Sequence, residues 1–182
     1  MFQKHLRFRG DDGTVEEYSR VLLATGSDPF IIPVPGHDLP GVISFRDIHD
    51  VDAMIAASKI KKKAVVIGGG LLGLEAANGL IKQGMDVTVV HLMDTLMERQ
   101  MDKVSGAMLK QSLEEKGMKF LMKTSTKEIL GDTSVTGIFF ADGSLIETDI
   151  VVMAVGIKPN IELAQQIGLH CERGIVVNDT LQ

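Results

Sequence analysis

The middle of the chain alternates between short apolar runs and a helix-like spacing of apolar residues. Residues 64–67 form an uninterrupted apolar run, residues 71–83 have apolar positions at helical spacing, and residues 86–90 return to a strand pattern. Continuous apolar runs are typical of parallel strands that are buried on both faces, and such strands are usually joined by a helix. The pattern therefore predicts a strand, a helix and a second strand of one parallel sheet.

Further elements of the same kind are predicted on both sides of this unit. Residues 47–58 and 103–116 have helical spacing, and Gly117 lies where the C-terminus of a helix favours glycine. Residues 119–122 and 150–155 have the composition of strands. Strands that alternate with helices indicate an α/β protein.

A small antiparallel meander is predicted between the last helix and the last strand of this region. Three strand-like pieces, residues 128–130, 137–140 and 145–148, are separated by Gly-Asp and Asp-Gly turns. We expect them to form a three-stranded antiparallel sheet attached to the parallel one.

The two ends of the chain have weaker patterns. Residues 2–8 and 15–23 predict a hairpin around a Gly-Asp-Asp-Gly turn, and the prolines of residues 29–40 predict an extended connection. A short helix over residues 161–167 and a strand over residues 174–179 are predicted near the C-terminus. The sequence therefore predicts a regular centre with irregular flanks.

Composition narrows the classes of partner. The 182 residues are 45% apolar and 24% charged, with a net charge of −5 and no concentrated basic patch, which excludes nucleic acid as an expected partner. No apolar run approaches the roughly 20 residues of a membrane helix, and no signal peptide is evident. The single cysteine, Cys171, and the absence of ligand spacing among the histidines predict no disulfide and no metal site. A cytoplasmic protein without a membrane partner is expected.

A glycine loop (residues 68–73) follows the first central strand and opens the central helix. Gly68, Gly70 and Gly73 satisfy the GxGxxG pattern. In that pattern the first glycine permits a tight turn, the second leaves room for a pyrophosphate, and the third lets the helix approach the strand, while the helix N-terminus offers N–H groups to the phosphates. The sequence therefore predicts a dinucleotide site, the alternative being a glycine-rich turn without a ligand.

Two residues are candidates for binding the adenosine ribose. Such units usually have an acidic residue at the end of the second strand, where this sequence has His91. Asp94 follows three residues later. Either Asp94 takes the acidic role or His91 itself bonds the ribose, and both alternatives stay open.

Three ordered segments make the chain similar to a known family. Residues 21–29, 65–77 and 149–160 resemble, in order and spacing, the pyridine nucleotide–disulfide oxidoreductases. Within that family, residues 90–102 are most similar to the FAD/NADH part of the NADH-dependent nitrite reductases. The resemblance covers essentially the whole chain.

The resemblance implies two cofactors. Ala24, Thr25 and Gly26 match the motif that lies beside FAD in the family. NADH would contact the glycine loop, and two further matched residues would lie near its nicotinamide end. The NADH contacts implied in this way are Gly68, Gly70, Leu71, Leu72, Glu75 and Gly156.

The resemblance also implies a division of the chain and a function. It predicts a Rossmann-like NAD-binding domain with the meander over residues 44–154, flanked by partial FAD-domain segments at residues 1–43 and 155–182. The family's two remaining FAD motifs are expected before residue 1 and after residue 182. In the longer enzyme, hydride would pass from NADH to FAD, and electrons would go on from FAD to electron-acceptor domains, with no side chain of this chain acting as acid or base.

Several alternatives remain at this point. The longer enzyme could be a rubredoxin or ferredoxin reductase, or the domain could hold a nucleotide without redox turnover. We expect the chain by itself to be inactive, and exposed apolar strands make a homodimer a further alternative.

Overall fold

The computed structural model describes residues 6–182. It divides into two compact units, the larger being Asp28–Lys158. The smaller unit combines the described residues up to Ser27 with Pro159–Gln182. Each unit is described by itself below. The assignment of the flanking segments to an FAD-binding domain stays a prediction.

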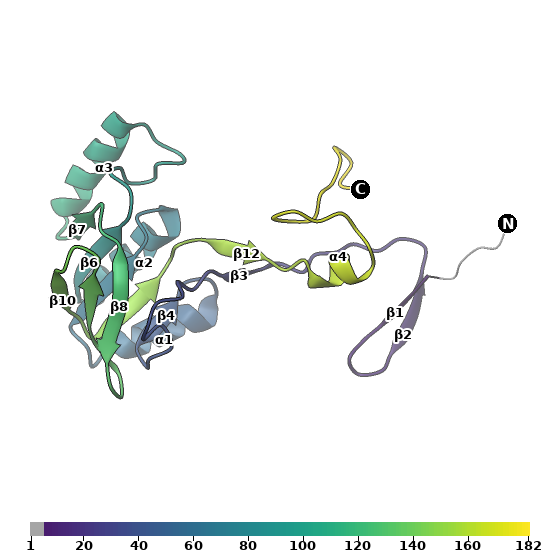
Figure 1. Ribbon diagram of the computed structural model, residues 1–182, viewed down its shortest axis with the longest axis horizontal. Coiled ribbons are helices and arrows are strands. Elements are labelled where there is room, and N and C mark those ends of the chain that lie inside the picture. The colour runs from purple at the N-terminus through teal and green to yellow at the C-terminus, as the bar shows by residue number, and fades with distance from the viewer. Residues whose placement is uncertain (1–5) are drawn as a thin grey trace. The chain divides into compact units, whose positions relative to one another are not determined.

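The larger unit is built on a five-stranded parallel sheet (Figure 1). The central helix connects two neighbouring strands of this sheet, β5 and β6, as the apolar pattern predicts. The fold class, a Rossmann-like α/β domain, is confirmed. In spatial order the strands are β4 (Val42–Ser44), β11 (Ile150–Met153), β5 (Lys63–Ile67), β6 (Asp86–His91) and β7 (Lys119–Met122).

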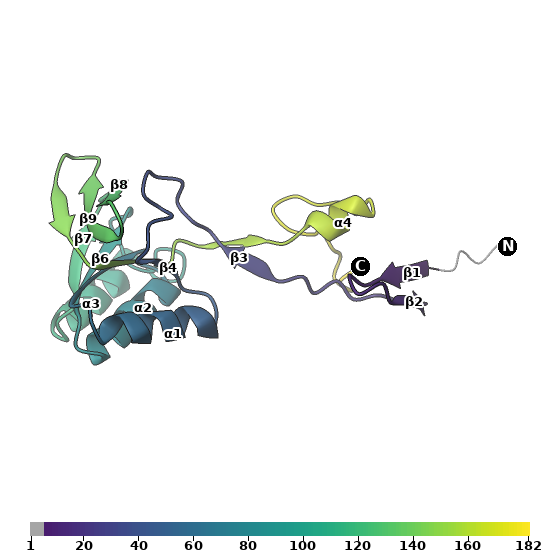
Figure 2. The same cartoon turned by 90° about the horizontal axis from the view of Figure 1, so that it is seen from below.

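Three helices cover one face of this sheet (Figure 2). They are α1 (Ile48–Ser58), α2 (Leu71–Lys82) and α3 (Lys103–Glu114). Each begins and ends within two residues of its predicted bounds. Asp47 is the N-cap of α1, since its carboxylate accepts the N–H groups of the second and third helical residues, which is why the helix starts one residue later than predicted.

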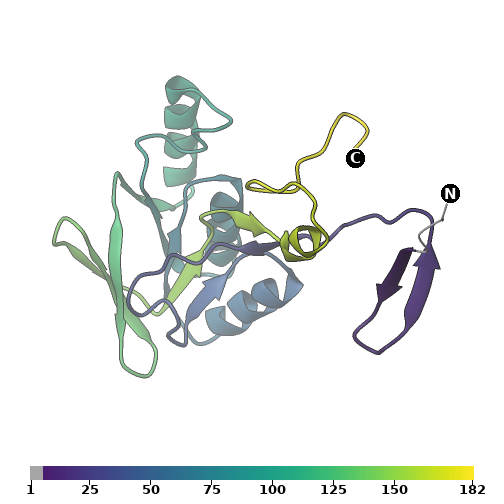
Figure 3. The ribbon, with the colours of Figure 1, turned by 45° about the vertical axis from the view of Figure 1, so that its right-hand side comes forward.

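The antiparallel meander covers the opposite face (Figure 3). It consists of β8 (Thr126–Gly131), β9 (Val135–Phe140) and β10 (Leu145–Glu147), with β9 in the middle. Both neighbouring pairs are antiparallel. The predicted three-stranded meander is therefore confirmed.

The residues of β5 explain why the strands read as unbroken apolar runs. Ala64 and Val66 belong to the core under the helices, whereas Val65 and Ile67 belong to the core under the meander. All four are at most 5% exposed. Because successive side chains point to opposite faces and both faces are covered, the four residues after Lys63 are all apolar.

The smaller unit contains less regular structure than predicted. The hairpin forms from β1 (Leu6–Arg9) and β2 (Val15–Tyr18), and α4 (Glu162–Gln166) lies near the C-terminus. The strand predicted over residues 174–179 is wrong: only an isolated bridge from Cys171 to Ile175 is found. Within the described residues this segment has no neighbouring strand to complete a ladder, so its apolar pattern alone does not make it a strand.

Two short strands were not predicted. β3 (Ser27–Pro29) and β12 (Ile157–Pro159) pair in a two-stranded sheet. Both contain proline at their last residue, which indicates a break rather than a strand when only the sequence is considered. The proline-rich stretch of residues 29–40 was expected to be extended, but residues 35–40 form successive turns.

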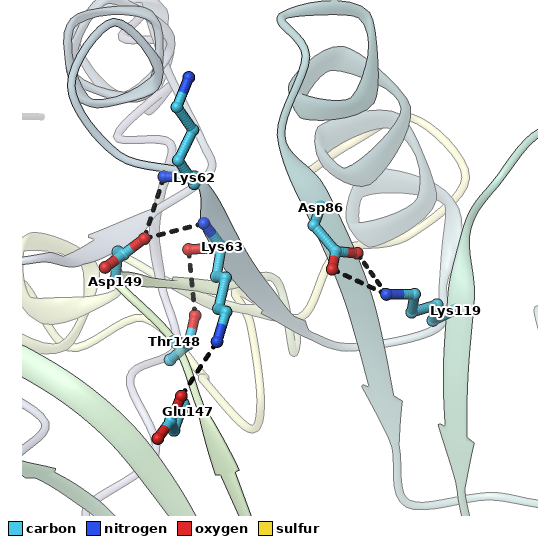
Figure 4. A network of polar contacts seen from close by, with 7 residues as sticks. All are labelled: Lys62, Lys63, Asp86, Lys119, Glu147, Thr148 and Asp149. Atoms are coloured by element: carbon cyan, nitrogen blue, oxygen red, sulfur yellow. Dashed lines mark hydrogen bonds and ion pairs between the residues drawn. The ribbon is translucent and has the colours of Figure 1, made fainter.

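Polar contacts fix the amino ends of the parallel strands (Figure 4). Asp149, just before β11, accepts the backbone N–H groups of Lys62 and Lys63 at 2.9 and 2.8 Å. The Lys63 ammonium also donates to Glu147 at 3.0 Å. These lysines therefore belong to the start of a strand, at the edge of the sheet opposite the glycine loop.

Replacing Asp149 by asparagine is expected to lower stability in a pH-dependent way. The N–H groups of Lys63 and Lys62 lower the pKa of this carboxyl, so its contribution is complete above the ordinary carboxyl pKa of about 3.9 and is lost as the pH falls through the lower folded value. Because this side chain is only partly buried, we expect a difference of only about 1 kcal/mol at neutral pH. Urea unfolding of both proteins at several pH values measures it. A difference that stays constant down to about pH 3 would contradict this reading.

Neither a membrane-spanning helix nor a cluster of metal ligands is found among residues 6–182. No helix there is long and apolar enough to cross a membrane. No group of three or more His, Cys, Asp or Glu side chains there is arranged to hold a metal ion.

Candidate dinucleotide site

The glycine loop lies at the carboxyl end of β5. Gly68 follows the last residue of the strand with φ of +123°, and its N–H donates to the Val90 carbonyl of β6 at 2.9 Å. A Cβ at Gly68 would overlap the carbonyl oxygen of Ala154, which follows β11. Positive φ and this close approach together require glycine at the turn.

The third glycine brings α2 close to the loop. Gly73 is buried in the first turn of α2, and a Cβ there would overlap the carbonyl oxygen of Gly68. The atom that it would meet belongs to the backbone, so it cannot move aside like a flexible side chain. Gly73 therefore has the packing role that the motif predicts.

The second glycine leaves an open space at the N-terminus of α2. Gly70 is the N-cap, and no side chain among the described residues caps the helix there. A Cβ built on Gly70 meets no atom within 4 Å. The first helical bond runs from the Leu74 N–H to the Gly70 carbonyl at 3.0 Å, so the preceding N–H groups have no acceptor within the helix. Open space and uncapped N–H groups fit a pyrophosphate.

Apolar and acidic side chains border this space. Leu71 and Leu72, at the start of α2, are 54% and 38% exposed, although large apolar side chains are usually buried. Glu75 is exposed on the same helix. A ligand bound at the N-terminus of α2 would have these side chains beside it.

Gly156 belongs to the same end of the sheet. The backbone that follows β11 reaches the glycine loop, because Gly68 approaches Ala154, two residues before Gly156. Gly156 is exposed, has φ of +126°, and accepts the Phe30 N–H at 2.9 Å. The structure thus places it near the loop, while its contact with nicotinamide stays a prediction.

His91 ends β6 and is buried, with 8% of its surface exposed. Its Nδ1 accepts the Gly69 N–H at 3.1 Å, and its Nε2 lies 3.1 Å from the Thr95 carbonyl and 3.2 Å from Oε2 of Glu98. An Nδ1 that accepts a hydrogen bond leaves the proton on Nε2, which donates to these oxygens. Both ring nitrogens are therefore used inside the protein.

Asp94 has partners of its own. Its carboxylate accepts the Lys103 ammonium at 3.2 Å and the Thr95 hydroxyl at 3.1 Å. The Lys103 hydrogen bond and then the Thr95 hydrogen bond lower the pKa of Asp94. The carboxylate is thus ionised at neutral pH, and it is paired with Lys103, the first residue of α3.

The segment after β6 folds back onto the glycine loop. Met93, Met97 and Met101 have the spacing of a helix face, but residues 92–100 form bends and turns. Met97 has φ of +51° and donates its N–H to the Gly69 carbonyl at 3.0 Å. The spacing of these methionines therefore does not correspond to a helix, although Met97 packs against the core under the helices.

Gly69 is a site residue that the sequence did not single out. A Cβ there would lie 2.7 Å from Cγ of His91 and 2.8 Å from Cδ2 of the buried Leu96. Its N–H and its carbonyl both bond to the segment that starts at His91. The only sequence signal is that this variable position of GxGxxG happens to be glycine.

The residues expected beside FAD lie in the smaller unit. The Thr25 hydroxyl donates to the Asn160 carbonyl at 2.5 Å, and the Asn160 amide donates to the Thr25 carbonyl at 3.2 Å. The Asn160 N–H donates to the Gly26 carbonyl at 3.1 Å, and Gly26 has φ of +70°. Two motif segments of the sequence are thus joined. The contact of Ala24, Thr25 and Gly26 with a flavin stays a prediction.

Known proteins share both the sequence and the fold. The chain is 56% identical over 172 residues to nitrite reductase [NAD(P)H] of Bacillus subtilis (strain 168), a match that covers 94% of this chain and 21% of that protein. The chain therefore spans about a fifth of the length of this relative.

Solved structures give the same result. The ferredoxin reductase for the CYP199A2 system from Rhodopseudomonas palustris has a TM-score of 0.88 at 32% identity, over 92% of this chain and 42% of that one. An FAD-dependent pyridine nucleotide-disulphide oxidoreductase from Desulfovibrio vulgaris has a TM-score of 0.80 at 30% identity, over 93% and 44%. The family model described as pyridine nucleotide-disulphide oxidoreductase matches residues 2–182. The chain belongs to the pyridine nucleotide-disulphide oxidoreductase family.

Proposed function

We propose that the glycine loop binds the pyrophosphate of NADH and that the chain is the NADH-binding part of an oxidoreductase that reduces FAD. The observation that carries this proposal is the open space at Gly70 beside the uncapped N-terminus of α2. Backbone N–H groups and the helix dipole favour an anion there. The similarity to a nitrite reductase [NAD(P)H] and to an FAD-dependent oxidoreductase supports both cofactors.

The chain's own residues would bind and orient the nucleotide. NADH supplies the hydride when it is bound, so the protein needs only to hold it against the acceptor. Leu71 and Leu72 would contact it beside the loop, and Glu75 and Gly156 would lie at its nicotinamide end. We assign no acid or base to this chain.

We also propose how the chain is divided in the full-length enzyme. Residues 44–154 would form the NAD-binding domain, and residues 1–43 and 155–182 would belong to an FAD-binding domain. Ala24, Thr25 and Gly26 would lie beside the flavin. The bonds that join Thr25 and Gly26 to Asn160 support this, because they hold together the two segments that enter and leave the larger unit.

Nitrite is the proposed terminal acceptor of the full-length enzyme. The 56% identity to nitrite reductase [NAD(P)H] supports it. A ferredoxin reductase is the second candidate, favoured by the TM-score of 0.88 to such an enzyme. NADH oxidation by the full-length protein with nitrite, and separately with ferredoxin, distinguishes the two.

The flavin spectrum of the full-length protein tests the redox proposal. Anaerobic addition of NADH is expected to bleach the flavin absorption bands. Bound NADH with unchanged bands would instead indicate a nucleotide-binding module without redox turnover. Absence of flavin from the purified full-length protein would contradict the proposal altogether.

NADH is expected to bind at least about tenfold more tightly than NADPH, a difference of about 1.4 kcal/mol. Asp94, whose pKa is lowered by Lys103, and Glu98 both follow β6. They would repel the additional 2′-phosphate of NADPH at the adenosine end. Calorimetric titration with both nucleotides at neutral pH measures the ratio. Tighter binding of NADPH would show that the acidic residues do not face the ribose.

A further inference from the structure

The end of β6 lacks the carboxylate that usually recognises the adenosine ribose. In strand–helix–strand units with this glycine loop, an acidic side chain near that place accepts the ribose hydroxyls. β6 ends on His91. If the loop binds NADH, as proposed above, the ribose acceptor must come from another residue.

His91 itself is a poor acceptor for the ribose. Its only ring lone pair, on Nδ1, is taken by the Gly69 N–H at 3.1 Å. Its Nε2 proton points to the Thr95 carbonyl and to Glu98. A ribose hydroxyl could bond His91 only by displacing one of these partners in a buried place, which costs a hydrogen bond.

Asp94 is directed elsewhere. It accepts hydrogen bonds from Lys103, the first residue of α3, and from Thr95. Within residues 6–182, none of its hydrogen bonds or ion pairs reaches the glycine loop. The negative charge of Asp94 acts on the nucleotide site only from a distance, and both of its oxygens already accept hydrogen bonds.

Glu98 is joined to the glycine loop through one imidazole ring. Its Oε2 accepts from Nε2 of His91, whose other nitrogen bonds Gly69. The backbone brings it to the same place, because the preceding residue, Met97, donates its N–H to the Gly69 carbonyl. The side chain is 33% exposed, and within residues 6–182 its Oε1 has no hydrogen-bond partner. One oxygen is thus held and the other is free to accept.

We propose that Glu98 is the carboxylate that accepts the 2′-hydroxyl of the adenosine ribose, and that His91 is the positioning residue that holds Glu98 beside Gly69. The proposal rests on NADH binding at the glycine loop and names the group that recognises its ribose. A carboxylate held by a donor on one oxygen keeps its orientation, so the ligand does not have to order it. The imidazole of His91 thus lies at the strand end where other proteins have the carboxylate, and the carboxylate of Glu98 is bound to its Nε2.

ADP and 2′-deoxy-ADP separate ribose recognition from pyrophosphate binding. The two nucleotides differ only in the 2′-hydroxyl, and competition with NADH gives the affinity of each. The unaltered chain should bind ADP about tenfold more tightly than 2′-deoxy-ADP, as expected for a hydrogen bond to a charged group. Glu98→Ala should bring this ratio close to one and leave the affinity for 2′-deoxy-ADP unchanged. Asp94→Ala is the matched control and should keep the ratio.

Two variants of His91 test its positioning role. In His91→Asn the amide oxygen can still accept the Gly69 N–H, but the side chain is too short to reach Glu98. This variant should lose the ratio and keep the affinity for 2′-deoxy-ADP. His91→Leu should lose the ratio and also bind both nucleotides more weakly, because the Gly69 N–H then has no acceptor.

The outcomes distinguish this inference from the proposed function. An unchanged ratio in Glu98→Ala, or an equal loss for both nucleotides, overturns the assignment of Glu98. Loss of the ratio in Asp94→Ala transfers the role to Asp94 and overturns it as well. If the unaltered chain does not bind NADH, or binds it equally well with valine in place of Gly70, the proposed function itself fails.

Discussion

Replacing Gly70 by valine is expected to weaken NADH binding at least about a hundredfold, or about 2.7 kcal/mol. The backbone at Gly70 is extended, with φ of −85° and ψ of −178°, so valine can adopt it without strain. The new side chain would fill the open space at the N-terminus of α2. A pyrophosphate would then be kept from the N–H groups that it needs.

Gly79→Val is the matched control for this prediction. Gly79 is exposed on the same helix, and a Cβ there also meets no atom within 4 Å. Both variants should unfold at the urea concentration of the unaltered chain to within a small difference, and only Gly70→Val should lose NADH. If Gly70→Val binds NADH like the unaltered chain, the glycine loop is not the site.

Replacing Gly73 by valine is expected to destabilise the larger unit by about 3 kcal/mol. A Cβ at Gly73 would overlap the carbonyl oxygen of Gly68, and this atom is fixed by the turn between β5 and α2. The overlap can be relieved only if α2 moves away from β5, and α2 supplies Leu74, Ala77 and Leu80 to the core under the helices. The variant would therefore lose stability because packing between α2 and the sheet is weakened along the helix.

Urea denaturation of Gly73→Val against Gly79→Val measures this effect. The two variants add the same side chain to the same helix, so helix propensity cancels to a first approximation. A difference in the free energy of unfolding smaller than about 0.5 kcal/mol, the usual effect of a surface substitution, would contradict this prediction, because it would mean that the backbone accommodates the valine without loss of stability.

The parallel sheet could be predicted because its information is local. Each residue of β5 after Lys63 faces one of two covered faces, so residues 64–67 are all apolar, and the glycine loop after them marks the turn into α2. The separate roles of Gly68, Gly70 and Gly73 also follow from their spacing alone. These parts of the structure agree with the sequence in position and in type.

The surroundings of His91 could not be predicted, since they depend on how a loop folds. The methionine spacing of residues 93–101 imitates a helix face, yet Met97 has positive φ and bonds to Gly69. Nothing in the order of residues shows that Nδ1 of His91 meets the Gly69 N–H or that Glu98 reaches Nε2. Contacts between loops far apart in sequence leave no periodic signal.

The prediction of strands in the flanking segments failed for a different reason. Residues 174–179 have a strand-like pattern but no neighbouring strand among the described residues, whereas β3 and β12 end in proline and nevertheless pair. A strand exists only with a partner. Local composition therefore predicts buried central strands well and isolated pairs poorly.

Proton–nitrogen NMR of the isotope-labelled chain, titrated with NADH, tests the central claim most directly. We predict that the backbone amide signals of Gly70, Leu71 and Leu72 shift with a common dissociation constant, because their N–H groups lie at the proposed pyrophosphate site. The amides at the opposite edge of the sheet, around Lys63 and Asp149, should stay unchanged. Absence of any shift, or shifts confined to residues away from the glycine loop, would contradict the claim that this loop binds NADH.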